Sequence, residues 1–143
     1  MATLNPYLNF NGNCEEAFNY YKSVFGGEFV TVMKYGEMPG EQPMSEADKK
    51  KLLHVSLPIG KGTTLMGSDM PESMPAVIIG NNFTISVNVD NEAEADKIFD
   101  GLAAGGKVSM PMQKTFWSPY FGMCADRFGI QWMVNCNETQ PTK

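Results

Sequence analysis

Two stretches with the same pattern decide the fold of this chain. Residues 7–27 read YLNFNGNCEEAFNYYKSVFGG, and residues 86–106 read SVNVDNEAEADKIFDGLAAGG. Each begins with alternating apolar and polar residues, which indicates a β-strand. Each then passes through a polar turn into an amphipathic helical pattern and ends in a pair of glycines, which can terminate a helix. The sequence therefore predicts a strand–helix unit that occurs twice.

The apolar residues of the two predicted helices define the faces that we expect to be buried, because they are spaced three and four apart. In the first helix they are Ala17, Tyr20, Tyr21, Val24 and Phe25, and in the second they are Ala95, Ile98, Phe99, Leu102 and Ala103. In each unit the polar turn before the helix can supply its N-cap.

Three strand-like segments follow each predicted helix. They are 28–35, 53–59 and 63–68 in the first unit, and 107–112, 120–125 and 130–136 in the second. Residues 36–50 form a loop, with one helical turn expected at 45–51. The sequence thus predicts a single domain over 1–143, with a βαβββ module at about 4–69, a linker at 70–81 and a second βαβββ module at about 82–136.

Composition excludes several classes of partner. The net charge is −5 and the basic residues are scattered, which argues against a nucleic-acid groove and against binding to an anionic membrane. No apolar run approaches the roughly 20 residues that cross a bilayer. The start of the chain lacks the pattern of a signal peptide, so we expect a cytoplasmic protein. The three cysteines contain no Cys-x-x-Cys pair, so neither a disulfide framework nor a zinc knuckle is predicted.

Alternation also predicts a polar face on the sheet. In the first strand of each module the apolar residues share one parity, which suits packing against the helices. The opposite parity carries Asn5, Tyr7, Asn9, Thr84, Ser86 and Asn88. The segment 53–59 repeats the pattern, with His54 and Ser56 on its polar side. Such a face either lies open to solvent or lines a pocket.

Three stretches resemble one known family. They are PYLNFNGNCEEAFNYYKSVFGGEF from Pro6, HVSLPIGKGTTLMGSD from His54 and FWSPYFGMCADRFGIQWMV from Phe116. They resemble the PhnB-like branch of the vicinal-oxygen-chelate superfamily, which includes glyoxalases, bleomycin-resistance proteins and extradiol dioxygenases. The resemblance implies an α+β fold of two βαβββ modules that form a curved, mostly antiparallel sheet around a cleft. It also implies a homodimer, and that the polar face lines the cleft.

The resemblance also assigns positions for metal ligands. In this sequence they fall at Asn5 or Pro6, Leu65 or Met66, Thr84 or Asn82, and Met133. None of these side chains is a strong ligand for Zn²⁺, Ni²⁺ or Fe²⁺, so we predict no metal and no cofactor. Relatives in this branch are often labelled ubiquinone-pathway methyltransferases. No glycine-rich loop follows a strand here to hold a nucleotide-like methyl donor, so the sequence does not predict that activity.

A few residues are candidates for chemistry. His54 is the single histidine, so any Ser-His or Cys-His arrangement must use it, although it also suits an ordinary sheet position. Trp117 and Tyr120 belong to an aromatic group that would favour a flat or apolar ligand, whereas Trp132 is expected to pack under a helix. Cys14 lies at a predicted helix start, where either a stabilised thiolate or a small buried residue is consistent with the pattern.

Three functions follow from these observations. The favoured one is a metal-free protein that binds a small molecule in a cleft. That cleft would be lined by His54, Tyr7, Asn9, Ser56, Thr84, Ser86, Asn88, Trp117, Tyr120 and Met133. The second is a lyase, isomerase or oxygenase of the superfamily type that uses His54 or a displaced metal. The third is a dimeric interaction module.

Overall fold

The computed structural model describes residues 2–40 and 43–137 of the chain. The chain divides into two compact units, and the boundary falls between Ile78 and Ile79, inside the predicted linker 70–81. Each unit contains one βαβββ module. None of the helices in the described ranges is long and apolar enough to cross a membrane.

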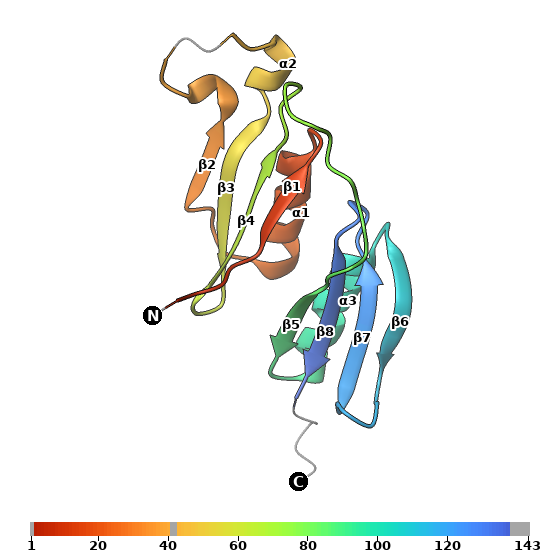
Figure 1. Cartoon of the computed structure of the whole chain (residues 1–143). Coiled ribbons are helices and arrows are strands. Elements are labelled where there is room, and N and C mark those ends of the chain that lie inside the picture. Colours follow the sequence, from red (N-terminus) through yellow and green to blue (C-terminus); the bar gives the residue numbers. More distant parts are fainter. Residues whose placement is uncertain (1, 41–42, 138–143) are drawn as a thin grey trace. The chain divides into compact units, whose positions relative to one another are not determined.

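The first unit builds a four-stranded sheet with one long helix. Its elements are β1 (Tyr7–Phe10), α1 (Cys14–Phe25), β2 (Thr31–Lys34), the short helices η1 (Tyr35–Glu37) and α2 (Glu46–Lys49), β3 (Leu52–Ile59) and β4 (Thr63–Asp69). The strand order is β1-β4-β3-β2, with β1 parallel to β4 and the other pairs antiparallel. Helix α1 lies along one face of this sheet (Figure 1).

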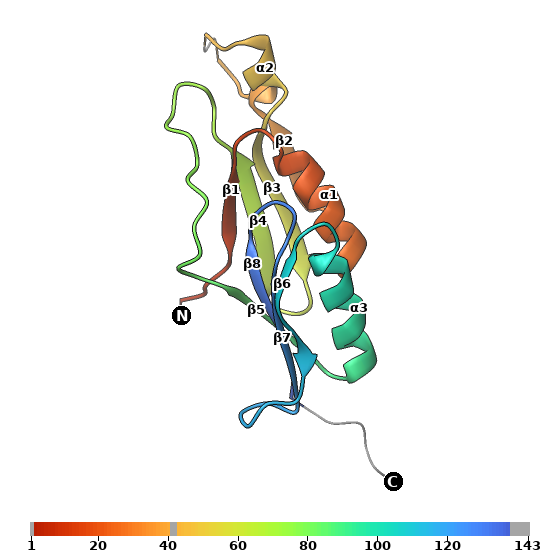
Figure 2. The ribbon, with the colours of Figure 1, turned by 90° about the vertical axis from the view of Figure 1, so that its right-hand side faces the viewer.

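The second unit repeats this arrangement. Its elements are β5 (Ile85–Val89), α3 (Glu92–Ala103), β6 (Lys107–Gln113), β7 (Tyr120–Ala125) and β8 (Gln131–Cys136). The strand order is β5-β8-β7-β6, again with one parallel pair. Figure 2 shows α3 along one side of its sheet. The predicted α+β class and the two modules are confirmed, although the strands form two mixed sheets rather than one.

Each helix packs closely against a glycine of its sheet. A Cβ atom added to Gly67 in β4 would lie 2.6 Å from the ring of Phe18 in α1. A Cβ atom added to Gly122 in β7 would lie 2.9 Å from the ring of Phe99 in α3. These contacts identify the helix-facing side of each sheet, on which the buried cores lie. The opposite side of each sheet is called its outward face below.

The predicted helix faces were mostly right for α3 and partly wrong for α1. In α3 the buried residues are Ala95, Ile98, Phe99 and Leu102, as the spacing predicts, whereas Ala103, which was also expected in the core, is half-buried. In α1 they are Cys14, Ala17, Phe18 and Tyr21. Tyr20, Val24 and Phe25, which were expected in the core, are only half-buried. Phe18 packs against Gly67, so the buried face of α1 lies nearer to the first turn of the helix than the spacing predicted.

The two helices also begin differently. The side chain of Asn91 caps α3 by accepting a hydrogen bond from the backbone N–H of Glu94 at 2.8 Å, as the polar turn predicts. The side chain of Asn13 makes no such bond at the start of α1. Instead, Asp69 at the end of β4 accepts hydrogen bonds from the N–H groups of Gly12 and Cys14, both at 2.9 Å. The carboxylate of Asp69, which is distant in sequence, thus caps α1 in place of a neighbouring side chain.

Candidate functional site

The strand register places a row of mostly polar side chains on the outward face of unit one. Tyr7 pairs with Met66, Met66 pairs with Ser56, and Ser56 pairs with Thr31. Paired residues of neighbouring strands share a face, so these four side chains lie on the side opposite α1. The next row, two residues along each strand, contains Asn9 and Ser68 as one pair and His54 and Met33 as another. The predicted polar parity of this module is confirmed.

Tyr7 and His54 form the most specific contact on that face. The hydroxyl of Tyr7 lies 3.2 Å from Nδ1 of His54, and the two ring centroids are 5.7 Å apart at an angle of 32°. Strand β4 lies between the two strands that carry them, so the contact spans it. Because Nδ1 is engaged, Nε2 is the nitrogen through which His54 can meet a ligand. Tyr7 is 44% exposed and His54 is half-buried, so the pair is accessible.

The positions that the resemblance assigns to metal ligands do not fit a metal of the zinc or iron type. The side-chain oxygen of Asn5 accepts a hydrogen bond from the N–H of Thr64 at 2.9 Å. Leu65 is buried, and the outward-facing neighbour is Met66. Met133 pairs with Ser86 and Met123. Among the described residues, no three or more His, Cys, Asp or Glu side chains are grouped so that they could hold a metal ion.

The outward face of unit two carries amides, thioethers and aromatic rings. The register forms one row of Asn88, Asn135, Phe121 and Gln113, and a second row of Ser86, Met133, Met123 and Met110. The ring of Trp117 stands edge-to-face on Phe121, with centroids 5.6 Å apart. The structure therefore brings Ser86, Asn88, Met133 and Trp117 to the outward face of unit two. Thr84 lies one residue before β5, outside the paired residues that define the face.

Tyr120 was placed wrongly by sequence reasoning. It is the first residue of β7 and pairs with the buried Cys136, so it lies on the helix-facing side. Its hydroxyl donates to Oδ1 of Asp96 in α3 at 2.5 Å. This hydrogen bond, together with burial and nearby acidic groups, raises the pKa of Tyr120 to about 12. Tyr120 therefore joins α3 to its sheet and does not face outward.

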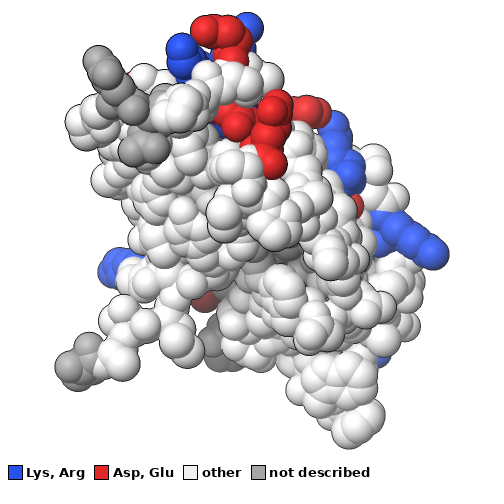
Figure 3. Space-filling model, turned by 45° about the horizontal axis from the view of Figure 1, so that its top comes forward, with Lys and Arg blue, Asp and Glu red and all other residues white. Residues whose placement is uncertain are grey.

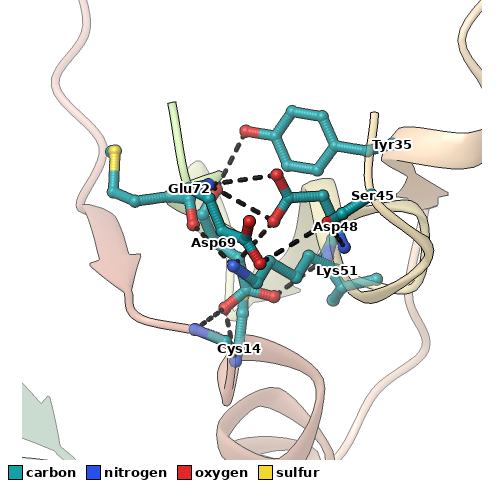
Figure 4. A network of polar contacts seen from close by, with 10 residues as sticks. Cys14, Tyr35, Ser45, Asp48, Lys51, Asp69 and Glu72 are labelled. Atoms are coloured by element: carbon teal, nitrogen blue, oxygen red, sulfur yellow. Dashed lines mark hydrogen bonds and ion pairs between the residues drawn. The ribbon is translucent and has the colours of Figure 1, made fainter. Parts of the chain in front are cut away.

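A buried polar network at the end of the first sheet was missed by sequence reasoning (Figure 4). Its centre is Asp69, which is 1% exposed. Besides holding the start of α1, its carboxylate accepts a hydrogen bond from the N–H of Leu52 at 2.9 Å. Its backbone carbonyl accepts one from the hydroxyl of Tyr35, also at 2.9 Å. The parity of β4 was the available signal, because Asp69 shares the helix-facing side with Leu65 and Gly67.

A second carboxylate extends this network. Asp48 in α2 accepts hydrogen bonds from the N–H of Glu72 and pairs with the ammonium group of Lys51 at 2.8 Å. The hydrogen bond from Lys51 lowers the pKa of Asp48 and raises that of Lys51. Figure 3 shows acidic and basic side chains gathered at the end of unit one that carries α2. The network joins α2 to the start of the 70–81 segment, and this role is structural.

The cysteines are unsuited to nucleophilic chemistry. All three are buried, and Cys14 has no exposed surface. Burial raises the pKa of the Cys14 thiol, and the nearby Asp69 raises it further. Burial also raises the pKa of Cys124 to about 11. A thiolate is the reactive form of cysteine, so of the two interpretations of Cys14 the structure favours the small buried residue.

Comparison with known proteins assigns the family. The family model described as 3-demethylubiquinone-9 3-methyltransferase matches residues 2–135. Protein YjdN of Escherichia coli K12 is 33% identical over 148 residues, which cover 98% of this chain and 99% of that protein. The crystal structure of protein PA1353 from Pseudomonas aeruginosa is 42% identical, with a TM-score of 0.85 over 98% of this chain and 100% of that one.

Two further solved structures relate the fold to the superfamily that the sequence resembles. The PhnB protein from Bacillus cereus is 25% identical, with a TM-score of 0.73 over 94% of this chain and 99% of that one. A glyoxylase/bleomycin resistance protein/dioxygenase domain from Frankia is only 10% identical, yet has a TM-score of 0.63 over 96% of this chain and 97% of that one. The last comparison concerns the fold alone. The chain therefore belongs to the PhnB-like family described as 3-demethylubiquinone-9 3-methyltransferase, with a glyoxalase-like fold.

Proposed function

We propose that this protein binds a small molecule on the outward faces of its sheets, without a metal ion. The observation that carries the proposal is the accessible contact between Tyr7 and His54. Neutral side chains with hydrogen-bonding capacity lie on the same face, among them the exposed Asn9 and the buried Ser56. Sites for small molecules typically place a few directed polar groups in a mainly apolar setting, and here the neighbouring Met66 supplies part of that setting.

The family description names a methyltransferase, a class of enzyme that needs a methyl donor. Free backbone N–H groups in a glycine-rich turn at a helix start are a common way to hold nucleotide-like groups. In unit one the N–H groups of Gly12 and Cys14 are already bonded to Asp69. In unit two the turn before α3 contains no glycine and is capped by Asn91. The two turns do not fit such a donor, so we derive no methyl-transfer step.

The ligand would meet His54 through Nε2. A tyrosine hydroxyl at Nδ1 holds the imidazole in one orientation, which lowers the cost of ordering it when a ligand binds. For the outward face of unit two we propose a separate set of ligand contacts, Ser86, Asn88, Trp117 and Met133, together with Thr84. The proposal includes no metal ion. The positions that the resemblance assigns to metal ligands carry groups such as the amide of Asn5 and the thioethers of Met66 and Met133, which are weak ligands.

A second candidate function is proton transfer by His54, and the same Tyr7 contact favours it. Histidine is the most frequent general acid–base residue, and a base must be held in the right orientation to act. This version predicts that His54→Gln, which retains hydrogen bonding but cannot carry the proton, abolishes turnover while ligand binding persists. Turnover that is equal in His54→Gln and the unchanged protein would exclude it.

The deciding experiment is a ligand screen by protein-observed NMR on the full chain. We expect hits that shift the His54 ring signals and that weaken in His54→Ala and Tyr7→Phe. The matched control is Thr63→Ala, an exposed position at the far end of β4. If no hit depends on His54 or Tyr7, the proposed site on unit one is wrong.

The homodimer and the cytoplasmic location expected from the sequence also belong to this proposal. Sedimentation of the full chain tests the first. A monomer at every concentration would remove both the homodimer and the alternative of a dimeric interaction module. Fractionation of cells that express the protein tests the second.

A further inference from the structure

Trp117 is held in a fixed position above the outward face of unit two. The residues from Thr115 to Ser118 close a tight turn, with the N–H of Thr115 donating to the carbonyl of Ser118 at 3.0 Å. The N–H of Ser118 donates back to the hydroxyl of Thr115, also at 3.0 Å. Ser118 is buried, and its hydroxyl donates to the side-chain oxygen of Asn135 in β8. The turn is therefore attached to the sheet beside the indole.

The indole is exposed although its support is buried. Trp117 is 56% exposed, whereas Phe121, on which it stands edge-to-face, is 7% exposed. An aromatic ring that is fixed by its surroundings and open to solvent loses little conformational freedom when a second ring packs on it. The surface beside it is soft and apolar, because Met123 lies next to Phe121 along the outward face, and Met133 and Met110 flank Met123. Thioethers contact aromatic rings favourably.

One edge of this surface offers oriented hydrogen-bond donors. The side-chain nitrogen of Asn135 donates to the side-chain oxygen of Asn88 at 3.2 Å. That bond uses the oxygen of Asn88, so its amide N–H groups are turned away from Asn135, and the residue is exposed to solvent. Asn88 and Phe121 lie two strands apart in the same row, about 10 Å at the usual spacing of strands. A fused-ring molecule is long enough to span this distance and contact both residues.

We propose that unit two binds a flat aromatic molecule with a hydrogen-bond acceptor, such as a hydroxyl or carbonyl oxygen, on its edge. The ring would pack against Trp117 and the methionine row, and the acceptor would receive a hydrogen bond from the amide of Asn88. This inference deepens the proposed function by naming a ligand class for its unit-two part. It uses no residue of the Tyr7–His54 pair.

The test uses 2-naphthol as the probe and the two indole N–H signals of the full chain as the readout. Trp132 is an internal reference, because its Nε1–H is buried and donates to Asp126 at 2.8 Å. We expect 2-naphthol to shift the Trp117 signal saturably while the Trp132 signal stays in place. Decahydro-2-naphthol, which has the same carbon skeleton and hydroxyl group but is not flat, should bind more weakly by roughly two- to tenfold.

Three variants sharpen the result, with affinities measured by calorimetry. Trp117→Leu should weaken 2-naphthol binding about tenfold, the factor expected for one aromatic contact. Phe83→Leu is the matched control, since Phe83 is another exposed aromatic residue of unit two, 61% exposed. Asn88→Ala should remove any preference for 2-naphthol over naphthalene.

The inference is overturned if 2-naphthol gives no saturable shift, if the flat and non-flat probes bind equally, or if Phe83→Leu costs as much as Trp117→Leu. His54→Ala separates this result from the proposed function. Binding of 2-naphthol that is unchanged in His54→Ala supports an independent site on unit two. Ligands whose binding depends on His54, found together with no binding of 2-naphthol, would contradict this inference and leave the proposed site on unit one in place.

Discussion

The carboxylate of Asp69, at the end of β4, accepts a hydrogen bond from the backbone N–H of Cys14, at the start of α1, at 2.9 Å. The two residues are 55 positions apart in the chain. The same carboxylate holds the N–H groups of Gly12 and Leu52. One buried side chain therefore joins the first helix, the third strand and the fourth strand of unit one.

Asp69→Ala should destabilise the protein by about 3 kcal/mol or more, because it leaves three backbone donors without their acceptor, and the donors of Cys14 and Leu52 are in a buried place. Asp69→Asn should cost less, since its oxygen can still accept while its NH₂ group opposes one N–H. Chemical denaturation of the full chain measures both. Asp90→Ala, at an exposed turn, is the control, and an equal loss there would contradict this role of Asp69.

Gly67→Ala should destabilise unit one by about 1–3 kcal/mol through overpacking. The added methyl group would lie 2.6 Å from the ring of Phe18 and 2.9 Å from the carbonyl oxygen of Leu8. The ring can move but the backbone cannot, so Gly67→Ala combined with Phe18→Leu should recover only part of the loss. Gly80→Ala has its nearest atom at 3.9 Å and should change the free energy of unfolding by less than about 0.5 kcal/mol. Thermal unfolding compares them, and a neutral Gly67→Ala would show that the contact is not close.

The free energy of unfolding should fall at alkaline pH. The pKa of Cys124 is raised from 9.0 to about 11 in the folded protein, and that of Tyr120 from 10.0 to about 12. Both groups ionise first in the unfolded chain. Their stabilising contributions are therefore complete below pH 9 and are lost as the pH rises through 11 and 12. Denaturation at pH 7, 9 and 10.5 measures the decline.

Tyr120→Phe should remove part of this alkaline decline, because it removes the phenol that donates to Asp96. Tyr20→Phe alters a phenol elsewhere and serves as the comparison. A decline that is identical in Tyr120→Phe and in the unchanged protein would mean that Tyr120 is not responsible.

Asp48→Asn should release the start of the 70–81 segment from α2. The carboxylate of Asp48 holds the N–H of Glu72 with both oxygens, and its pKa is lowered mainly by the hydrogen bond from Lys51. Because the pKa in the folded state lies below the ordinary 3.8, this contribution is present above that pH and is lost as the pH falls further. Hydrogen exchange at Glu72 should become faster in the variant. Glu46→Gln, which alters an exposed ion pair with Lys49, should leave that rate unchanged.

Local pattern determined most of the architecture. Alternation and helical spacing act over a few neighbouring residues, so they predicted the eight strands, the α3 face and the outward position of His54. The segment 120–125 was predicted with the bounds that β7 has. The same rules found the βαβββ repeat, because each module obeys them independently.

Tertiary structure decided what depends on residues far apart in the chain. In the sequence, Asp69 looks like an ordinary residue at the end of a strand. It caps α1 only because β4 packs against that helix. Tyr120 was predicted as part of an aromatic group that contacts a ligand, and only its pairing with Cys136 shows that it faces Asp96. The Tyr7–His54 contact needs the order β1-β4-β3. Periodicity determines which face a side chain takes, but strand order and register determine which side chains it meets there.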